Sequence, residues 1–288
     1  MCQRMWVMAT LVYRVDTMLT PRVTGAAIGS SGGTGMKPMV IVIPSYNNRQ
    51  WYEQNLASVC AQTYGNFRAI YVDDGSSDQT GALVEQLLAD HAVRQRIQLI
   101  RNPVRIGALE NLYRHIHTCD DQEIVILLDG DDWLAHPRVL QTLNAVYSDP
   151  HCWMTYGQYT SWPASAPAYS RPIPAQITEA NTFREYDWCA SHLRSFYVWL
   201  FKRINREDLI SPWGTFYPMA WDQALMFPML EMAGHRAKFI PDVLYTYNTA
   251  NPINDAKVNR PLQRQCETAI RQQKPYDRLE SDPAHMPR

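Results

Sequence analysis

Short apolar runs alternate with segments of helical spacing between Met39 and Tyr147, and this alternation restricts the fold more than any other feature of the chain. The apolar runs have the length and composition of buried strands, and they read VIVIP, FRAIYVDD, IQLI and IVILL. The helical segments that follow them are Gln50–Gln62, Thr80–His91, Ala108–His117 and Pro137–Tyr147. This alternation predicts an α/β fold with a doubly wound, mostly parallel sheet that is flanked by helices and joined by right-handed crossovers.

Three of these strands end in polar clusters: PSYNN follows the first, DDGSSD the second and DGDDW the fourth. Because ligands of such sheets bind beyond the carboxyl ends of the strands, we expect the clusters to face one crevice. Beyond Tyr156 the chain changes to a Pro-rich loop, aromatic segments and one amphipathic helix, Asp222–Ala233, which ends at Gly234. We expect this part to form a smaller lobe that covers the crevice.

The acidic cluster Asp129, Asp131 and Asp132 concentrates like charge directly after a buried strand. Carboxylates one residue apart share a divalent cation, and an all-oxygen set with few protein ligands suits Mg²⁺ or Mn²⁺ completed by waters and substrate phosphates. The alternative is a solvated acidic turn before the next helix, since Asp-Gly is common turn chemistry. We favour the metal site because a turn needs only one or two acids.

Two residues near the ends of the first and second strands have the chemistry of a nucleotide site. Asp74 carries a carboxylate that accepts hydrogen bonds from a ring N–H or a ribose hydroxyl. Tyr46 offers a flat face for stacking a base, although a lone Tyr at a strand end is as often mere packing. Asp78 is interpreted as the N-cap of the helix that starts near Thr80.

Composition argues against several other classes of protein. With 27 basic and 28 acidic side chains the net charge is -1, so we expect no nucleic-acid partner. The six cysteines are scattered without a C-x-x-C pair or zinc spacing, which indicates reduced thiols in a cytoplasmic protein. The apolar stretch Met5–Tyr13 is too short to span a bilayer, so we expect no transmembrane segment and, at most, peripheral contact with a membrane.

VIVIPSYNN, YVDDGSSDQT, the pair Arg105-x-Gly107 and LLDGDDWL, in this order and at these distances, resemble the motifs of family 2 glycosyltransferases with the GT-A fold. The likeness covers about residues 37–250. It implies a nucleotide-sugar donor, UDP-sugar favoured, bound by residues of these motifs: Pro44, Tyr46, Asp74, Arg105, Gly107, Asp129 and Asp131. It also implies Mn²⁺ or Mg²⁺ at Asp131 and Asp132, and the D-x-D spacing favours Asp131 as the main ligand.

The resemblance and the composition together divide the chain into four parts. Residues 1–36, with the linker-like stretch GAAIGSSGGTG, are expected to be a disordered extension. Residues 37–156 are expected to be the nucleotide-sugar-binding half of the GT-A domain, and residues 157–271 the half that binds the acceptor and carries the base. The polar, Pro-bearing tail 272–288 is expected to be disordered.

The catalytic base that the resemblance implies is Asp222. Relatives commonly carry an acidic pair at this helix start, whereas here Trp221 replaces the first acid. The alternative role for Asp222 is a helix cap that stabilises the dipole by about 0.3 to 1 kcal/mol.

Two further departures concern the region that contacts the leaving diphosphate. Asn248 and Asn251 stand roughly where relatives carry Arg and His, so Arg194 or Lys257 are the alternative donors to the diphosphate. His192 and Arg194 belong to the segment SHLRSFYVWLF, which we interpret as part of the acceptor wall, with simple surface solvation as the alternative for both side chains.

The implied reaction moves a sugar with inversion from the nucleoside diphosphate to a hydroxyl of a glycan or lipid-linked acceptor, with Asp222 taking the hydroxyl proton. A phosphatase of the haloacid dehalogenase type is disfavoured, because the acidic motif follows the fourth strand and its fifth position is Trp133. A nucleotidyltransferase is disfavoured, because PSYNN replaces a Gly-rich loop. The remaining alternative is a binding protein of the same fold that has lost turnover.

Overall fold

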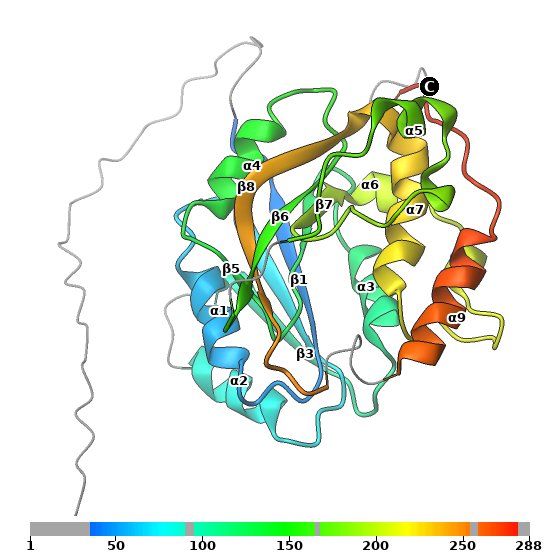
Figure 1. Ribbon diagram of the computed structural model, residues 1–288. Coiled ribbons are helices and arrows are strands. Elements are labelled where there is room, and N and C mark those ends of the chain that lie inside the picture. The colour runs from blue at the N-terminus through cyan, green and yellow to red at the C-terminus, as the bar shows by residue number, and fades with distance from the viewer. Residues whose placement is uncertain (1–34, 90–94, 165–167, 254–258, 282–288) are drawn as a thin grey trace, which may run out of the picture. The chain divides into compact units, whose positions relative to one another are not determined.

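The computed structural model describes residues 35–89, 95–164, 168–253 and 259–281. Within them, one eight-stranded sheet has the order β3-β2-β1-β4-β7-β6-β8-β5 (Figure 1). The strands are β1 (Met39–Ser45), β2 (Phe67–Asp73), β3 (Ile97–Arg101), β4 (Ile124–Leu127), β5 (Trp133–Leu134), β6 (Met154–Trp162), β7 (Arg194–Tyr197) and β8 (Ala237–Asn248). The four apolar runs of the sequence are β1 to β4, and their pairing is parallel as predicted.

Helices cover both faces of the sheet (Figure 1). They are α1 (Tyr52–Cys60), α2 (Thr80–Ala89), α3 (Ala108–Ile116), α4 (Val139–Val146), α5 (Ala175–Ala180), α6 (Val198–Phe201), α7 (Trp221–Ala233) and α9 (Arg260–Arg271), with short 3-10 turns at η2 (Phe183–Glu185), η3 (Arg206–Leu209) and η4 (Gly234–Arg236). Ile41 of β1 shares a core with α1, α2 and α4, whereas Val42 shares the opposite core with α3 and α7. Because alternate residues of β1 enter two cores, this strand is apolar along most of its length.

The strands of the C-terminal half extend the same sheet, but several of them pair antiparallel to their neighbours. β7 is antiparallel to β4 and β6, while β8 runs parallel to β6 and antiparallel to β5. The boundary that we place at residue 156 lies inside β6, so the expected smaller lobe is a continuation of one sheet.

Helix α7 is buried all around, and the prediction of an amphipathic helix was wrong. Every residue from Gln223 to Ala233 is buried, including Glu231. The Glu231 carboxylate is paired with the Arg184 guanidinium, whose Nε lies 2.5 Å from Oε1. A buried charge requires such a partner, and the partner lies far away in the sequence.

The segment 272–281 corrects the expectation of a disordered tail. In Figure 1 it leaves α9 and returns toward α5, and the backbone N–H of Leu279 donates to the carbonyl of Met232 at 3.0 Å. The side chains of Tyr276 and Leu279 pack on the core, so two apolar residues hold a segment of otherwise polar composition. The expectations of disorder for residues 1–34 and 282–288 fall outside the described residues.

Two findings concern thiols and membranes. The cysteines of the described ranges are all free: Cys60, Cys119, Cys152, Cys189 and Cys266. Among the helices that the structure describes, none combines the length and apolar character needed to cross a bilayer.

Candidate functional site

A cavity of about 500 Å³ opens where the carboxyl ends of β1, β2 and β4 meet the start of β7 and of α7. Its volume lies in the range of small-molecule sites. The predicted site residues that line it are Pro44, Tyr46, Asp74, Arg105, Asp129, Asp131, Asp132 and Asp222. Gly107 is not part of this lining, but its backbone N–H donates to Asp74, and the alternative phosphate donor Lys257 falls outside the described residues.

The acidic loop, residues 129–132, is held by hydrogen bonds to strand β1 and helix α1. The backbone N–H of Gly130 donates to the carbonyl of Pro44 at 3.1 Å. The Asn55 side-chain amide donates to the carbonyls of Asp129 and Asp132 at 2.9 and 2.8 Å. A Cβ on Gly130 would lie 2.6 Å from the Cβ of Ser45, so only glycine permits this close approach.

Asp132 is the most deeply buried member of the loop, with no exposed surface. Its Oδ2 accepts a hydrogen bond from the Tyr245 hydroxyl at 2.6 Å, and its Oδ1 accepts one from the backbone N–H of Asn248 at 2.7 Å. Burial, together with the charges of Asp131 and Asp129, raises the pKa of Asp132 well above its usual range. The loop therefore carries more negative charge than its surroundings stabilise.

Asp131 lies at the cavity wall and is tied to the segment that departs from the family pattern. The Asn251 side-chain amide donates to Asp131 Oδ2 at 2.7 Å, and the Asn248 side chain donates to the Asp131 carbonyl at 3.1 Å. Burial raises the pKa of the Asp131 carboxyl, and the hydrogen bond from Asn251 partly opposes this. The two asparagines thus anchor the acidic loop at the position where Arg and His were expected.

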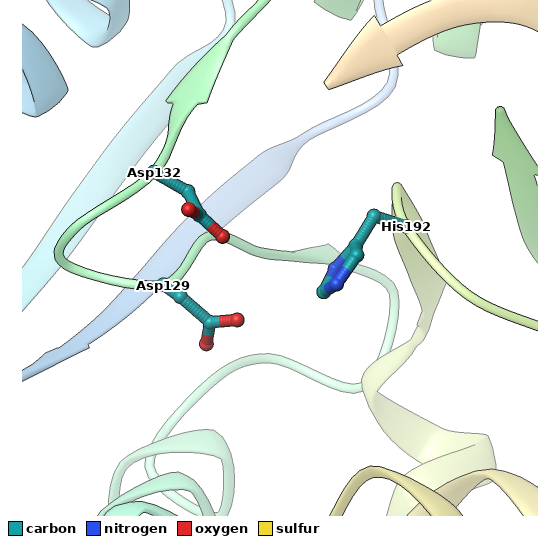
Figure 2. Close-up of side chains that lie close together, drawn as sticks. All are labelled: Asp129, Asp132 and His192. Atoms are coloured by element: carbon teal, nitrogen blue, oxygen red, sulfur yellow. The ribbon is translucent and has the colours of Figure 1, made fainter. Parts of the chain in front are cut away.

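Figure 2 shows Asp129, Asp132 and His192 converging on one point. One ligand atom from each lies within 4.8 Å of the others, which is a grouping that could hold a metal ion. Asp131, favoured as a ligand by its spacing, lines the cavity but is not a member of this group.

His192 and Arg194 were candidates for surface solvation, and the structure rejects that alternative because both are buried. The His192 ring stacks on the Tyr245 ring at 4.4 Å between centroids. Burial, and secondarily the charge of Arg194, lowers the pKa of His192 well below its usual value, so the imidazole is neutral at pH 7.

Asp74 organises the loop that follows β3. Its Oδ1 accepts hydrogen bonds from the Asn102 side chain and the Ile106 N–H, both at 2.9 Å, and its Oδ2 accepts one from the Gly107 N–H at 2.8 Å. Burial acts to raise the pKa of Asp74, but these hydrogen bonds outweigh it and leave the pKa below its ordinary value. Gly107 has φ +96°, a conformation that L side chains rarely adopt.

The Tyr46 ring is covered by a cation. The Arg105 Cζ lies 4.0 Å from the ring centroid, and both side chains line the cavity. This contact places an aromatic face, a guanidinium and Asp74 on one wall, which is the wall predicted for a nucleotide.

Asp222 occupies the first turn of α7 and lines the same cavity as the acidic loop. The Arg194 guanidinium donates to its Oδ2 at 2.9 Å and lies 5.8 Å from the Trp221 ring centroid. Burial lowers the pKa of Arg194, but the charges of Asp222 and Asp129 outweigh it and leave the pKa raised. Trp221 therefore helps to hold the cation that orients Asp222.

Several site residues escaped the sequence reasoning, namely Asn55, Tyr159, Tyr169, Tyr245 and Tyr247. Asn55 carried a readable signal, since it is a buried polar residue on the apolar stripe of α1. Tyr159, Tyr245 and Tyr247 carried none, because an aromatic residue on a strand is ordinary core composition, and Tyr169 lies in a loop.

The comparisons with known proteins identify the family of the chain. The chain belongs to glycosyl transferase family 2, whose model matches residues 40–207, more than half of the sequence. The glycosyltransferase GlyG of Streptococcus pneumoniae is 23% identical over 215 residues, which covers 72% of this chain and 69% of the relative. The glucosyltransferase WfgD of Escherichia coli is 30% identical over 101 residues, 35% of this chain and 38% of the relative. The chain spans under half the length of several relatives, at 36%, 46% and 32%.

Solved structures match the fold. S. aureus TarS 1-349 in complex with UDP-GlcNAc aligns with a TM-score of 0.57 and 15% identity over 77% of this chain and 61% of that protein. The mannosyltransferase PcManGT of Pyrobaculum calidifontis, in complex with GDP-Man and Mn²⁺, aligns with a TM-score of 0.53 and 21% identity over 77% of this chain and 59% of that protein. The predicted GT-A fold is confirmed.

Proposed function

We propose that the protein is an inverting, metal-dependent glycosyltransferase that moves a sugar from a nucleoside diphosphate donor to an acceptor hydroxyl in the synthesis of a surface polysaccharide or another glycan. One observation carries the proposal: Asp222 and the acidic loop line the same cavity. Transfer with inversion needs a base for the acceptor hydroxyl and a site for the leaving diphosphate within one cavity, and these residues would supply both.

The donor is expected on the wall formed by Tyr46, Asp74 and Arg105. We favour UDP-sugars, in keeping with the UDP-GlcNAc of TarS and the UDP-Glc in the name of WfgD, while the GDP-Man of PcManGT makes GDP-sugars the second choice. WfgD is named for transfer to a diphosphoundecaprenol-linked sugar, so a glycan or lipid-linked acceptor fits the same class.

The acidic loop fits a divalent cation such as Mn²⁺ or Mg²⁺. Burial raises the pKa values of Asp131 and Asp132, and the charges of Asp131 and Asp129 raise the pKa of Asp132 further; a bound cation would oppose these effects. When bound, the metal supplies positive charge that stabilises the leaving diphosphate.

The chain's own residues perform the proton transfer. Asp222 Oδ2 is held by Arg194, and among the described residues no donor occupies its Oδ1. This oxygen takes the proton from the acceptor hydroxyl as the hydroxyl oxygen bonds to the anomeric carbon and the bond to the diphosphate breaks. Arg194 keeps the carboxylate in one orientation.

Calorimetry with UDP and Mn²⁺, followed by a UDP-sugar and acceptor screen, tests the proposal. We expect Asp222→Asn to retain UDP binding and to lose about 10²- to 10⁴-fold in transfer rate, the usual contribution of a general base. Asp242→Asn, at an exposed position, is the matched control. UDP binding without turnover on any acceptor would favour a binding protein of the same fold, and no nucleotide binding would refute the donor site.

A further inference from the structure

His192 occupies an unusual position for a buried polar side chain. It precedes β7, is only 8% exposed and lines the cavity, and among the described residues no hydrogen bond to its ring nitrogens is found. An imidazole in the wall of a cavity is accessible to a ligand bound there, and neutral imidazole is a common metal ligand. In Figure 2 the ring is directed at Asp129 and Asp132.

The ring is held rigidly by its aromatic neighbours. It stacks on Tyr245 with an interplanar angle of 9° and on Tyr247 with an angle of 18°, while Tyr159 packs edge-on against it. Tyr245 also donates to Asp132, so one tyrosine positions both the imidazole and the carboxylate. The hydrogen bond from Tyr245 to Asp132 is the kind of outer contact that fixes the orientation of a ligating carboxylate.

We propose that His192 is a metal ligand, and that together with Asp129 and Asp132 it forms a nitrogen-containing cation site. The inference rests on the proposed metal dependence and adds to it the identity of the ligands. One atom from each residue already lies within 4.8 Å of the others. The hydrogen bonds to Asp132 do not prevent ligation, because an ionised carboxylate offers about four lone-pair positions.

This ligand set predicts which cation the protein selects. Mg²⁺ prefers oxygen ligands only, whereas imidazole suits first-row transition metals, and affinity for a site with nitrogen ligands rises along the series from Mn²⁺. We therefore expect Mn²⁺ to bind substantially more tightly than Mg²⁺. An all-oxygen site at Asp131 would discriminate less between the two ions.

Pulsed electron paramagnetic resonance of Mn²⁺ bound in the presence of UDP reads the ligands directly. A coordinated imidazole couples ¹⁴N to the Mn²⁺ spin, and labelling all histidines with ¹⁵N changes that coupling in the unaltered protein. His192→Phe keeps an aromatic ring against Tyr245 and removes the nitrogen, and the exposed His235→Gln is the control. Calorimetry with Mn²⁺ and with Mg²⁺ gives the affinity ratio for each protein.

We expect a histidine nitrogen signal in the unaltered protein and in His235→Gln, and its absence in His192→Phe. Since loss of even an outer partner weakens metal affinity 10- to 100-fold, Mn²⁺ affinity in His192→Phe should fall at least about tenfold, with Mg²⁺ affected less. Tight Mn²⁺ binding without nitrogen coupling in the unaltered protein would overturn the assignment and leave the proposed function standing. Absence of Mn²⁺ and UDP binding together would refute both.

Discussion

Replacing Asp74 by Asn tests whether its carboxylate organises the donor wall. The change keeps the volume of a side chain that is only 3% exposed. If the amide oxygen takes the position of Oδ1, it still accepts from Asn102 and Ile106, but the amide NH₂ then faces the N–H of Gly107. A buried donor without an acceptor costs about 1 to 3 kcal/mol, and the two remaining hydrogen bonds lose the charge that strengthened them. We expect a total loss of about 2 to 3 kcal/mol of unfolding free energy.

Urea unfolding at pH 7 measures this loss, with Asp242→Asn as the exposed control. The loop between Asn102 and Gly107 carries Arg105, so UDP binding should weaken together with stability. A change below about 0.5 kcal/mol, the usual range for surface substitutions, would refute the organising role.

The pH dependence of the same comparison gives a second test. The pKa of Asp74 is lowered in the folded protein, so the stability that its charge contributes is present above the unfolded pKa of about 3.9 and is lost as pH falls through the folded value. The difference between the unaltered protein and Asp74→Asn should therefore shrink below about pH 4. A difference that grows on acidification would contradict the lowered pKa.

Two further substitutions test the core and the acidic loop. Arg184→Met strands the buried Glu231 carboxylate, so we expect a loss of about 3 to 5 kcal/mol in urea unfolding, largely recovered when Glu231→Leu is added; no recovery would argue against the ion pair. Gly130→Ala places a Cβ 2.6 Å from the Cβ of Ser45, so UDP affinity measured by calorimetry should fall at least about tenfold. Gly65→Ala, whose nearest contact is the flexible end of Met36 at 3.3 Å, should leave it unchanged.

The parallel half of the fold was predictable because its inner strands are buried on both faces. Such strands are continuous apolar runs, and the four predicted helices have bounds within two residues of α1 to α4 where described. β6 and β7 gave no comparable signal, since they bury Thr155 and Ser195. The two hydroxyls form a hydrogen bond of 2.6 Å with each other, and the Tyr147 hydroxyl forms one with Ser195. Contacts between residues so far apart in the chain cannot be predicted from one sequence.

The candidate site was predictable to the level of its loops. The strand-end rule gathers Tyr46, Asp74 and the acidic loop into one cavity, as the structure has it. The rule does not predict how the side chains of adjacent carboxylates are oriented. Asp132 is held by Tyr245 and Asn248 of β8, and Asp131 by Asn251 just beyond it, so their orientations depend on tertiary contacts rather than on spacing.

The hydrogen bonds to Asp132 also determine when the site can exist during synthesis. Its two partners, Tyr245 and Asn248, lie 113 and 116 residues further along the chain. A ribosome that has released only the first half of the sheet exposes the D-x-D segment without the groups that orient it. Closing so long a loop is slow compared with local helix formation, so the acidic loop is completed by the last strand of the sheet to be made. A nascent chain is thus without its finished acidic site until β8 has left the ribosome.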